Sequence, residues 1–196
     1  MTVKELYEKL ANKDFQDYNT AKLFWPVYMY GYNPKEEYQI RQEILDIRDR
    51  LHRPNNYLNV MTMDIFQEFL NFLEASNFGK RKKLDFYLEN EPEKPEKVEQ
   101  ALKKDANDGK FFDYIHHRIT EHLESSADFE VAYVFIYGWG AIFPYLRTSK
   151  FLNNFEKNIG KYKLIVFYPG KVKPSYSLFG LVNDENLYRA TTLIND

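Results

Sequence analysis

The hydrophobic and polar positions follow two periods along the chain, which predicts an α/β protein. Runs of β-branched and aromatic residues, typical of buried strands, occur at residues 23–30, 59–63, 131–137 and 164–168. Between these runs, apolar residues recur every three or four positions, as they do in helices that pack one face on a sheet. The repeated order of strand, helix and strand predicts a mainly parallel sheet flanked by helices, with a P-loop-like topology.

Capping residues set the bounds of the first long helix. Asn33 is a candidate N-cap, Pro34 takes the first helical position, and Glu36 is placed to complete a capping box. Pro54 ends this helix. Its apolar face consists of Ile40, Ile44, Ile47 and Leu51.

Further helices are predicted along the rest of the chain. One covers residues 3–10, and another covers residues 112–123. Asp64, followed three residues later by Gln67, has the N-cap arrangement of a helix that follows the second strand. Pro144 is expected to begin the helix before the fourth strand.

The C-terminal part predicts a small antiparallel edge on the sheet. Pro169 and Gly170 form a turn signal that is expected to end the fourth strand. Two short strands follow at residues 176–181 and 187–193, joined by residues 183–186.

One segment departs from this pattern within what we interpret as a single domain of residues 1–196. Residues 80–110 contain 17 charged residues in 31, with Pro92 and Pro95 in the middle. We expect a solvated insertion there. The basic run at residues 80–83, close to aromatic side chains, leaves open a DNA-binding module, although acidic residues soon neutralise it.

Composition narrows the class of protein. With 196 residues of which 44% are hydrophobic, the chain suits one domain with a substantial core. It has no cysteine, so it has no thiolate metal site, and 27 basic against 29 acidic residues give no net positive field for nucleic acid. We find no apolar run of 18 residues and no signal-peptide pattern, and we therefore expect a soluble cytoplasmic protein.

The loops after the predicted strands carry little catalytic chemistry. Residues 31–37 lie where a phosphate-binding loop would lie, but they lack a Gly-Lys-Ser/Thr ending, and Glu36 and Glu37 would repel phosphate from the helix N-terminus. Asp64 could hold magnesium, yet an N-cap explains it more simply. A nucleotide-binding enzyme or switch remains the alternative to a non-catalytic protein.

Two other groups are candidates for chemistry. The glycines of residues 138–144 either allow an anion to approach the backbone or only make the turn, with Trp139 packing inside or meeting a partner. His117 and Glu121 lie four residues apart, but two ligands do not make a metal site. We therefore expect no catalytic residue, no metal and no cofactor.

Several stretches together resemble one family. They are FPYLRTSKFLNNF, KLIVFYPG, SLFGL and LYRA in the C-terminal third, with FWPVYMYGYNPKEEYQIRQEIL near the N-terminus. Their order and spacing resemble the BrxB family of bacterial BREX phage-exclusion systems. The resemblance covers nearly the whole chain and is loose only at residues 79–110.

The resemblance implies a non-catalytic scaffold or adaptor in a BREX anti-phage complex that methylates host DNA and blocks phage replication. The implied partner is the PglZ component, which resembles alkaline phosphatases. Trp139, Arg147, Asn153, Asn154 and Arg189 are the candidate partner-binding residues. Arginine and amide side chains can hold a partner through charge-assisted hydrogen bonds, or bind backbone carbonyls within the fold.

Overall fold

The computed structural model describes residues 1–17, 26–125, 129, 131–155, 159–160, 162–172, 176–178, 182–184 and 191–192. The described helices are α1 (Val3–Ala11), α2 (Lys13–Gln16), the 3-10 turn η1 (Pro34–Glu36), α4 (Glu37–His52), α5 (Ile65–Ala75), α6 (Lys83–Asn90), α7 (Pro95–Ala106), α8 (Gly109–Ser125), α9 (Trp139–Ile142) and α10 (Thr148–Phe155). The described strands are β1 (Val27–Tyr32), β2 (Asn59–Asp64), β3 (Asn77–Phe78), β4 (Arg81–Lys82), β5 (Ala132–Tyr137), β6 (Lys163–Lys171), β7 (Tyr176–Leu178), β8 (Val182–Asp184) and β9 (Thr191–Thr192).

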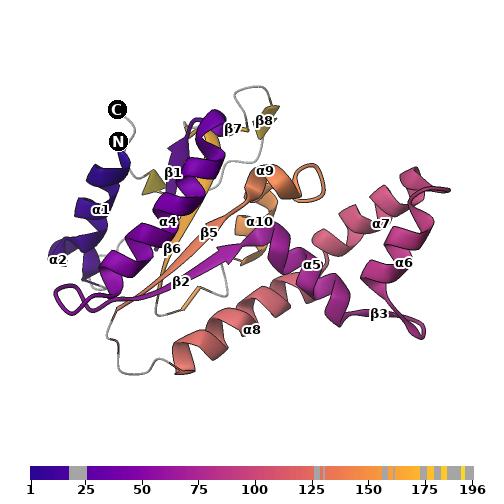
Figure 1. The fold of residues 1–196 in the computed structure, drawn as a ribbon, viewed down its shortest axis with the longest axis horizontal. Coiled ribbons are helices and arrows are strands. Elements are labelled where there is room, and N and C mark those ends of the chain that lie inside the picture. Colours follow the sequence, from indigo (N-terminus) through magenta and orange to yellow (C-terminus); the bar gives the residue numbers. More distant parts are fainter. Residues whose placement is uncertain are drawn as a thin grey trace.

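A parallel sheet forms the centre of the molecule (Figure 1). Its strand order is β2-β5-β6-β1-β9, and every neighbouring pair in that order is parallel. The first strand is therefore internal, as in P-loop-like sheets, and the loop after it has no Walker motif. The predicted α/β fold with a parallel sheet is confirmed.

Helices cover both faces of the sheet because its strands alternate two sets of apolar side chains. In β1, Tyr28 and Tyr30 face a core that also contains the buried residues of α1 and α4. Val27 and Met29 face a second core, which is built with α5, α8, α9 and α10. Buried strands with two covered faces read as continuous apolar runs, which explains the sequence pattern.

The predicted caps of α4 and α5 are largely confirmed. The Asn33 side chain accepts a hydrogen bond from the Lys35 backbone N–H at 3.1 Å, but one 3-10 turn precedes α4. Asp64 caps α5 by accepting bonds from the backbone N–H groups of Phe66 and Gln67. Side-chain acceptors at these ends satisfy donors that have no partner inside the helix.

Two proline predictions were wrong. Pro144 does not begin a helix: it follows a cis peptide bond in a turn, and α10 starts only at Thr148. Pro169 and Gly170 do not end the fourth strand, because β6 continues to Lys171. Pairing explains the longer strand, since Tyr32 of β1 lies opposite Pro169 and β7 pairs with the end of β6.

The C-terminal strands differ in detail from the predicted edge. β7 pairs antiparallel with β6 and with β8, as expected of an antiparallel extension. However, Asn183 and Asp184, predicted to lie in the connection, belong to β8. Of the predicted strand 187–193, the structure describes only residues 191–192, which form β9 and pair parallel, not antiparallel, with β1.

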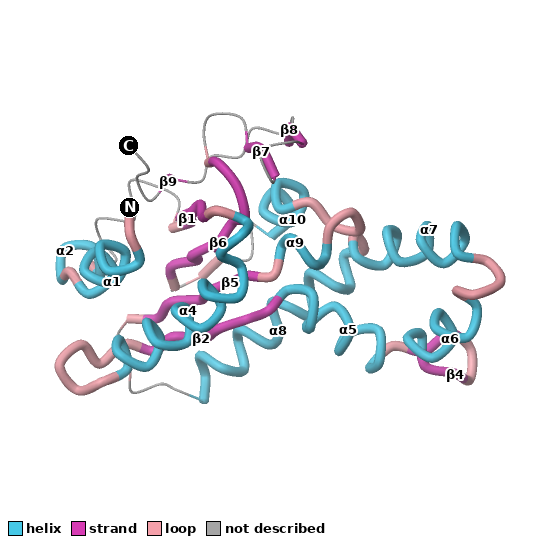
Figure 2. The backbone as a smooth tube through the Cα atoms, turned by 45° about the horizontal axis from the view of Figure 1, so that its top comes forward, coloured by secondary structure: helices cyan, strands magenta, loops and turns pink. Residues whose placement is uncertain are grey.

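Residues 80–110 form more structure than the predicted solvated insertion. They contain α6 and α7, which project with the β3–β4 hairpin beyond the sheet (Figures 1 and 2). Most of their side chains are exposed, but Tyr87, Val98 and Ala106 are buried and join the core on the α8 side. We call α6, α7 and this hairpin the helical lobe.

None of the helices within the described ranges combines the length and the apolar character that crossing a lipid bilayer would require.

Candidate functional site

The carboxyl ends of the parallel strands are the usual ligand position in an open α/β sheet. Here that edge is formed by Tyr32 at the end of β1, Asp64 at the end of β2 and Tyr137 at the end of β5. Asp64 and Tyr137 lie opposite each other in the parallel ladder. Helix α4 starts beside this edge and contributes charged side chains that contact the strand ends.

An internal network of hydrogen bonds occupies this edge. Arg41 of α4 donates from Nε to Glu37 Oε1 at 2.9 Å and from a terminal nitrogen to Asp64 Oδ2 at 2.5 Å. The Tyr32 hydroxyl donates to the other oxygen of Glu37. Burial, reinforced by this hydrogen bond, raises the pKa of Tyr32 well above its usual value, so the phenol stays protonated.

Both carboxylate oxygens of Asp64 are therefore engaged. Oδ2 accepts from Arg41, and Oδ1 accepts from the backbone N–H groups of Phe66 at 3.0 Å and Gln67 at 3.4 Å. Gly138, with φ of +85°, lies so close that a Cβ there would be 2.3 Å from Asp64 Oδ1. A metal ion or phosphate at this edge would have to displace protein partners of Asp64 that already balance its charge.

Sequence reasoning identified Asp64 as a cap but missed Arg41. A usable signal was present, because Glu37 and Arg41 are four residues apart on one helix and such pairs face each other. The link from Arg41 to Asp64 has no comparable signal, since it joins α4 to a strand end that lies elsewhere in the sequence.

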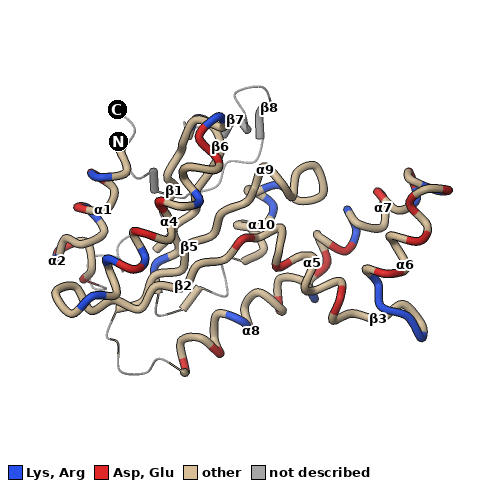
Figure 3. The backbone as a smooth tube through the Cα atoms, in the orientation of Figure 1, with Lys and Arg blue, Asp and Glu red and all other residues tan. Residues whose placement is uncertain are grey.

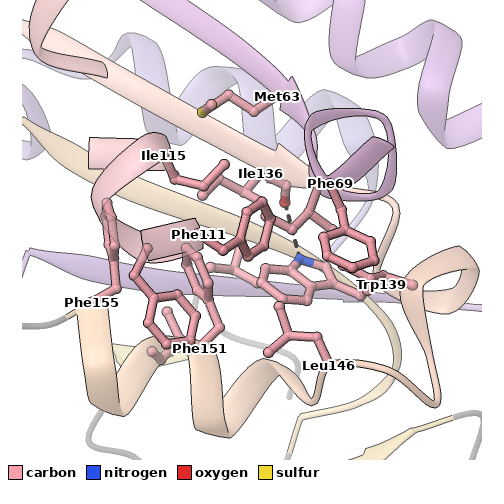
Figure 4. Close-up of a cluster of buried hydrophobic side chains, with 14 of the residues drawn as sticks. Met63, Phe69, Phe111, Ile115, Ile136, Trp139, Leu146, Phe151 and Phe155 are labelled. Carbon is pink, nitrogen blue, oxygen red and sulfur yellow. Dashed lines mark hydrogen bonds between the residues drawn. The ribbon is translucent and has the colours of Figure 1, made fainter. Parts of the chain in front are cut away.

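Trp139 lies in the core, with 1% of its surface exposed. Its indole N–H donates to the Ile136 carbonyl at 3.4 Å, and its ring packs edge-on against Phe151 of α10 (Figure 4). A side chain so enclosed offers no surface to a partner. Of the two predicted roles for Trp139, the structure favours packing.

Three of the predicted partner-binding residues belong to one surface. Arg147 immediately precedes α10, while Asn153 and Asn154 lie on it, and all three are exposed. Lys150 is exposed on the same helix, and its carbonyl accepts a hydrogen bond from the Asn154 amide at 2.7 Å. We call Arg147, Lys150, Asn153 and Asn154 the α10 face. Arg189 lies outside the described residues.

The α10 face is held on a buried base. Phe151, Leu152 and Phe155 of the same helix are each no more than 1% exposed, and the rings of Phe151 and Phe155 stack at 4.9 Å. Within the described part of the chain, no hydrogen bond or ion pair engages the Arg147 guanidinium. The fold thus presents a cationic and amide surface on a helix whose base is buried.

The histidines give no metal site in the ranges that the structure describes. His117 and Glu121 form an exposed pair on α8 at 3.2 Å. His122 is partly buried, with Nε2 2.7 Å from Asn59 Oδ1. Burial, with a smaller contribution from Arg118, lowers the pKa of His122 below its usual value.

Comparison with known proteins gives the family. The model of the family described as "BREX protein BrxB" matches residues 61–193. A relative named "BREX protein BrxB", from Bacillus cereus (strain H3081.97), is 26% identical over 199 residues, which cover 97% of this chain and 95% of that protein. No solved structure matches the chain significantly. The family match includes β2 from Met61 onward, β5, β6 and α10. The chain belongs to the BrxB family of BREX phage-defence proteins.

Proposed function

We propose that this chain is a non-catalytic adaptor within a cytoplasmic BREX defence complex, and that the α10 face binds a PglZ-like component. The exposed Arg147, which has no partner within the described residues, is the observation that carries this proposal. Membership of the BrxB family supports a role in BREX defence. The PglZ-like partner is the one implied by the family resemblance.

The physical character of the α10 face suits protein recognition. Arginine is enriched at interfaces because its planar guanidinium binds carboxylates and carbonyls through several donors at once. The backbone beneath is fixed by buried aromatic residues, so binding would lose little backbone entropy.

The carboxyl edge of the sheet supports a non-catalytic role. The side chains that a nucleotide enzyme would direct at magnesium or phosphate are committed to one another, as Arg41 is to Glu37 and Asp64. An incoming triphosphate would meet Glu36 and Glu37 at the start of α4.

Binding to the purified PglZ-like protein from the same host tests this proposal. Arg147→Glu should weaken the affinity at least about tenfold, because it reverses a charge at the centre of the proposed contact. Arg53→Glu is the matched control, since Arg53 is exposed after α4 and the substitution changes the net charge equally. If both variants bind the PglZ-like protein with equal affinity, Arg147 does not contribute to the interface.

A thermal-shift experiment tests the non-catalytic role separately. Because a ligand that binds only the native state raises its melting temperature, ATP or GTP with magnesium should leave the melting temperature unchanged. A saturable increase, abolished by Asp64→Asn, would instead favour the nucleotide-binding alternative.

A further inference from the structure

The tip of the helical lobe combines an exposed aromatic ring with positive charge. Phe78 on β3 is 55% exposed, and it directly precedes the turn of the β3–β4 hairpin. Lys80, Arg81 and Lys82 follow it and are all exposed. Figure 3 shows a continuous basic stretch beside β3, at the lower end of the lobe in this view. We call residues 78–82 the hairpin tip.

The Phe78 ring is supported from below. It stacks on Phe86 of α6 with ring centroids 4.5 Å apart, and Phe86 packs edge-on against Tyr87. Tyr87 is buried and donates its hydroxyl proton to Asp105 of α7 at 2.7 Å, while Lys83 pairs with the other oxygen of that carboxylate at 2.7 Å. A chain of fixed contacts therefore connects the exposed ring to the interior of the lobe.

The hairpin backbone is fixed as well. Phe78 lies opposite Arg81 in the two-stranded ladder, so their side chains share one face. The Lys83 N–H closes the base of the hairpin through the Ser76 carbonyl at 2.9 Å, and Arg81 pairs with Glu89 of α6. The backbone and the Phe78 ring of this surface would lose little entropy on binding, because their geometry exists before the partner arrives.

The charges of the hairpin tip indicate the chemistry of its partner. Within the described residues, Lys80 and Lys82 have no acidic partner, whereas Arg81 and Lys83 are already paired. Lys80 lies in the turn next to Phe78, and Lys82 lies opposite Asn77 on the other face of the ribbon, so unpaired positive charge is present on both sides of the hairpin tip. This arrangement matches a surface that offers carboxylates around an apolar slot. Complementary charges of this kind select the partner and accelerate its association.

Nucleic acid fits this surface less well. Asp85 and Glu89 are exposed on the helix that starts at the hairpin, and Glu91 and Glu93 follow at its far end. These carboxylates would repel a phosphate backbone that extended along the lobe, whereas a short acidic segment that contacts only residues 78–82 would not extend along α6. A nucleic-acid surface requires positive charge that persists along one face.

We propose that the hairpin tip is a second docking surface, at which Phe78, Lys80 and Lys82 bind an acidic segment of another protein of the complex. It lies at the end of the lobe, away from the α10 face (Figure 1). The two surfaces would allow the chain to hold two partners at once.

Site-specific crosslinking tests this inference in the full chain. Phe78 is replaced by p-benzoylphenylalanine, the chain is produced together with the other BREX components of its host, and the adducts formed under ultraviolet light are identified by mass spectrometry. We expect an adduct with an Asp- and Glu-rich segment of another component. Lys80→Glu with Lys82→Glu should reduce its yield at least about tenfold.

Matched controls separate recognition from general charge and from folding. Lys97→Glu with Lys104→Glu reverses two exposed charges on α7 of the same lobe and should leave the adduct yield unchanged. The melting temperature of each variant shows that the lobe stays folded. Changing the acidic residues of the crosslinked segment to lysine should restore the adduct with the Lys80→Glu, Lys82→Glu variant.

Four results would overturn the proposal. They are an adduct with nucleic acid, an adduct with a second copy of this chain, an adduct with a segment that lacks carboxylates, and no adduct at all. Failure of the charge exchange to restore crosslinking would also contradict it, because the lysines would then not recognise the carboxylates.

Discussion

Gly138→Ala should destabilise the fold through two separate effects. Gly138 has φ of +85°, which costs an L-residue about 1–2 kcal/mol. The new Cβ would also lie 2.3 Å from Asp64 Oδ1, so the carboxylate must move away from the α5 N-terminus. Loss of a helix cap costs about 0.5–2 kcal/mol. Together these effects predict that the free energy of unfolding falls by about 1.5–4 kcal/mol.

Two other glycines isolate the contributions. Gly79 also has positive φ, at +62°, but a Cβ there would meet nothing within 4 Å, so Gly79→Ala should show only the backbone cost. Gly109 starts α8 and has neither constraint, so Gly109→Ala should change stability by no more than about 1 kcal/mol. Urea unfolding monitored by circular dichroism provides all three free energies.

A double variant tests the steric origin of the effect. If Asp64 is already alanine, the Cβ at position 138 meets no carboxylate, so the two substitutions together should cost less than the sum of their separate effects by about 1 kcal/mol or more. Equal destabilisation by Gly138→Ala and Gly79→Ala, or additivity with Asp64→Ala, would refute the reasoning.

Three further predictions concern buried side chains. Trp139→Ala should lower the free energy of unfolding by about 3–5 kcal/mol, because it empties a core site, and near-native stability in urea would contradict its burial. Lys163→Met should cost about 1–3 kcal/mol, since the Lys163 ammonium is a donor to the Phe15 carbonyl; an unchanged melting temperature would oppose this. Burial lowers the pKa of folded His122, so the unfolded chain binds more protons as the pH falls through about 6.5 and stability decreases. His122→Gln should reduce the loss of melting temperature between about pH 7.5 and about pH 5.5, and an equal loss in the variant and the wild-type protein would contradict this.

The core elements could be predicted from the sequence because their information is local. The buried positions Ile40, Ile44, Ile47 and Leu51 recur at the helical period. The apolar runs of the strands show no helical periodicity over a similar length. The position of Asp64 between an apolar strand and an amphipathic helix predicted its role as a helix cap. These signals depend only on neighbours within one or two helical turns.

The errors arose where contacts distant in sequence decide the structure. Pro169 stays within β6 because Tyr32 of β1 lies opposite it, and no local rule reports that pairing. The charged segment 80–110 became a lobe because a few residues, such as Tyr87 and Val98, bury against the rest of the core. The sequence predicted a solvated segment because its many charged residues concealed these few apolar positions.

The candidate partner-binding residues show the same limit. Family resemblance selected Arg147, Asn153 and Asn154, and the loop of residues 138–144 suggested Trp139. Neither signal could separate a residue that builds the core from residues that the core supports. Their burial in the structure provides that distinction. It changes the prediction for Trp139, whose replacement should now destabilise the domain and not merely weaken assembly.

Co-elution with the PglZ-like protein of the same host tests the proposed adaptor role most directly. The two purified proteins are mixed at micromolar concentration and analysed by size-exclusion chromatography with light scattering. The adaptor role predicts one complex of fixed stoichiometry, which is lost with Arg147→Glu and kept with Arg53→Glu. Separate elution of the two wild-type proteins, each at its own mass, would contradict it.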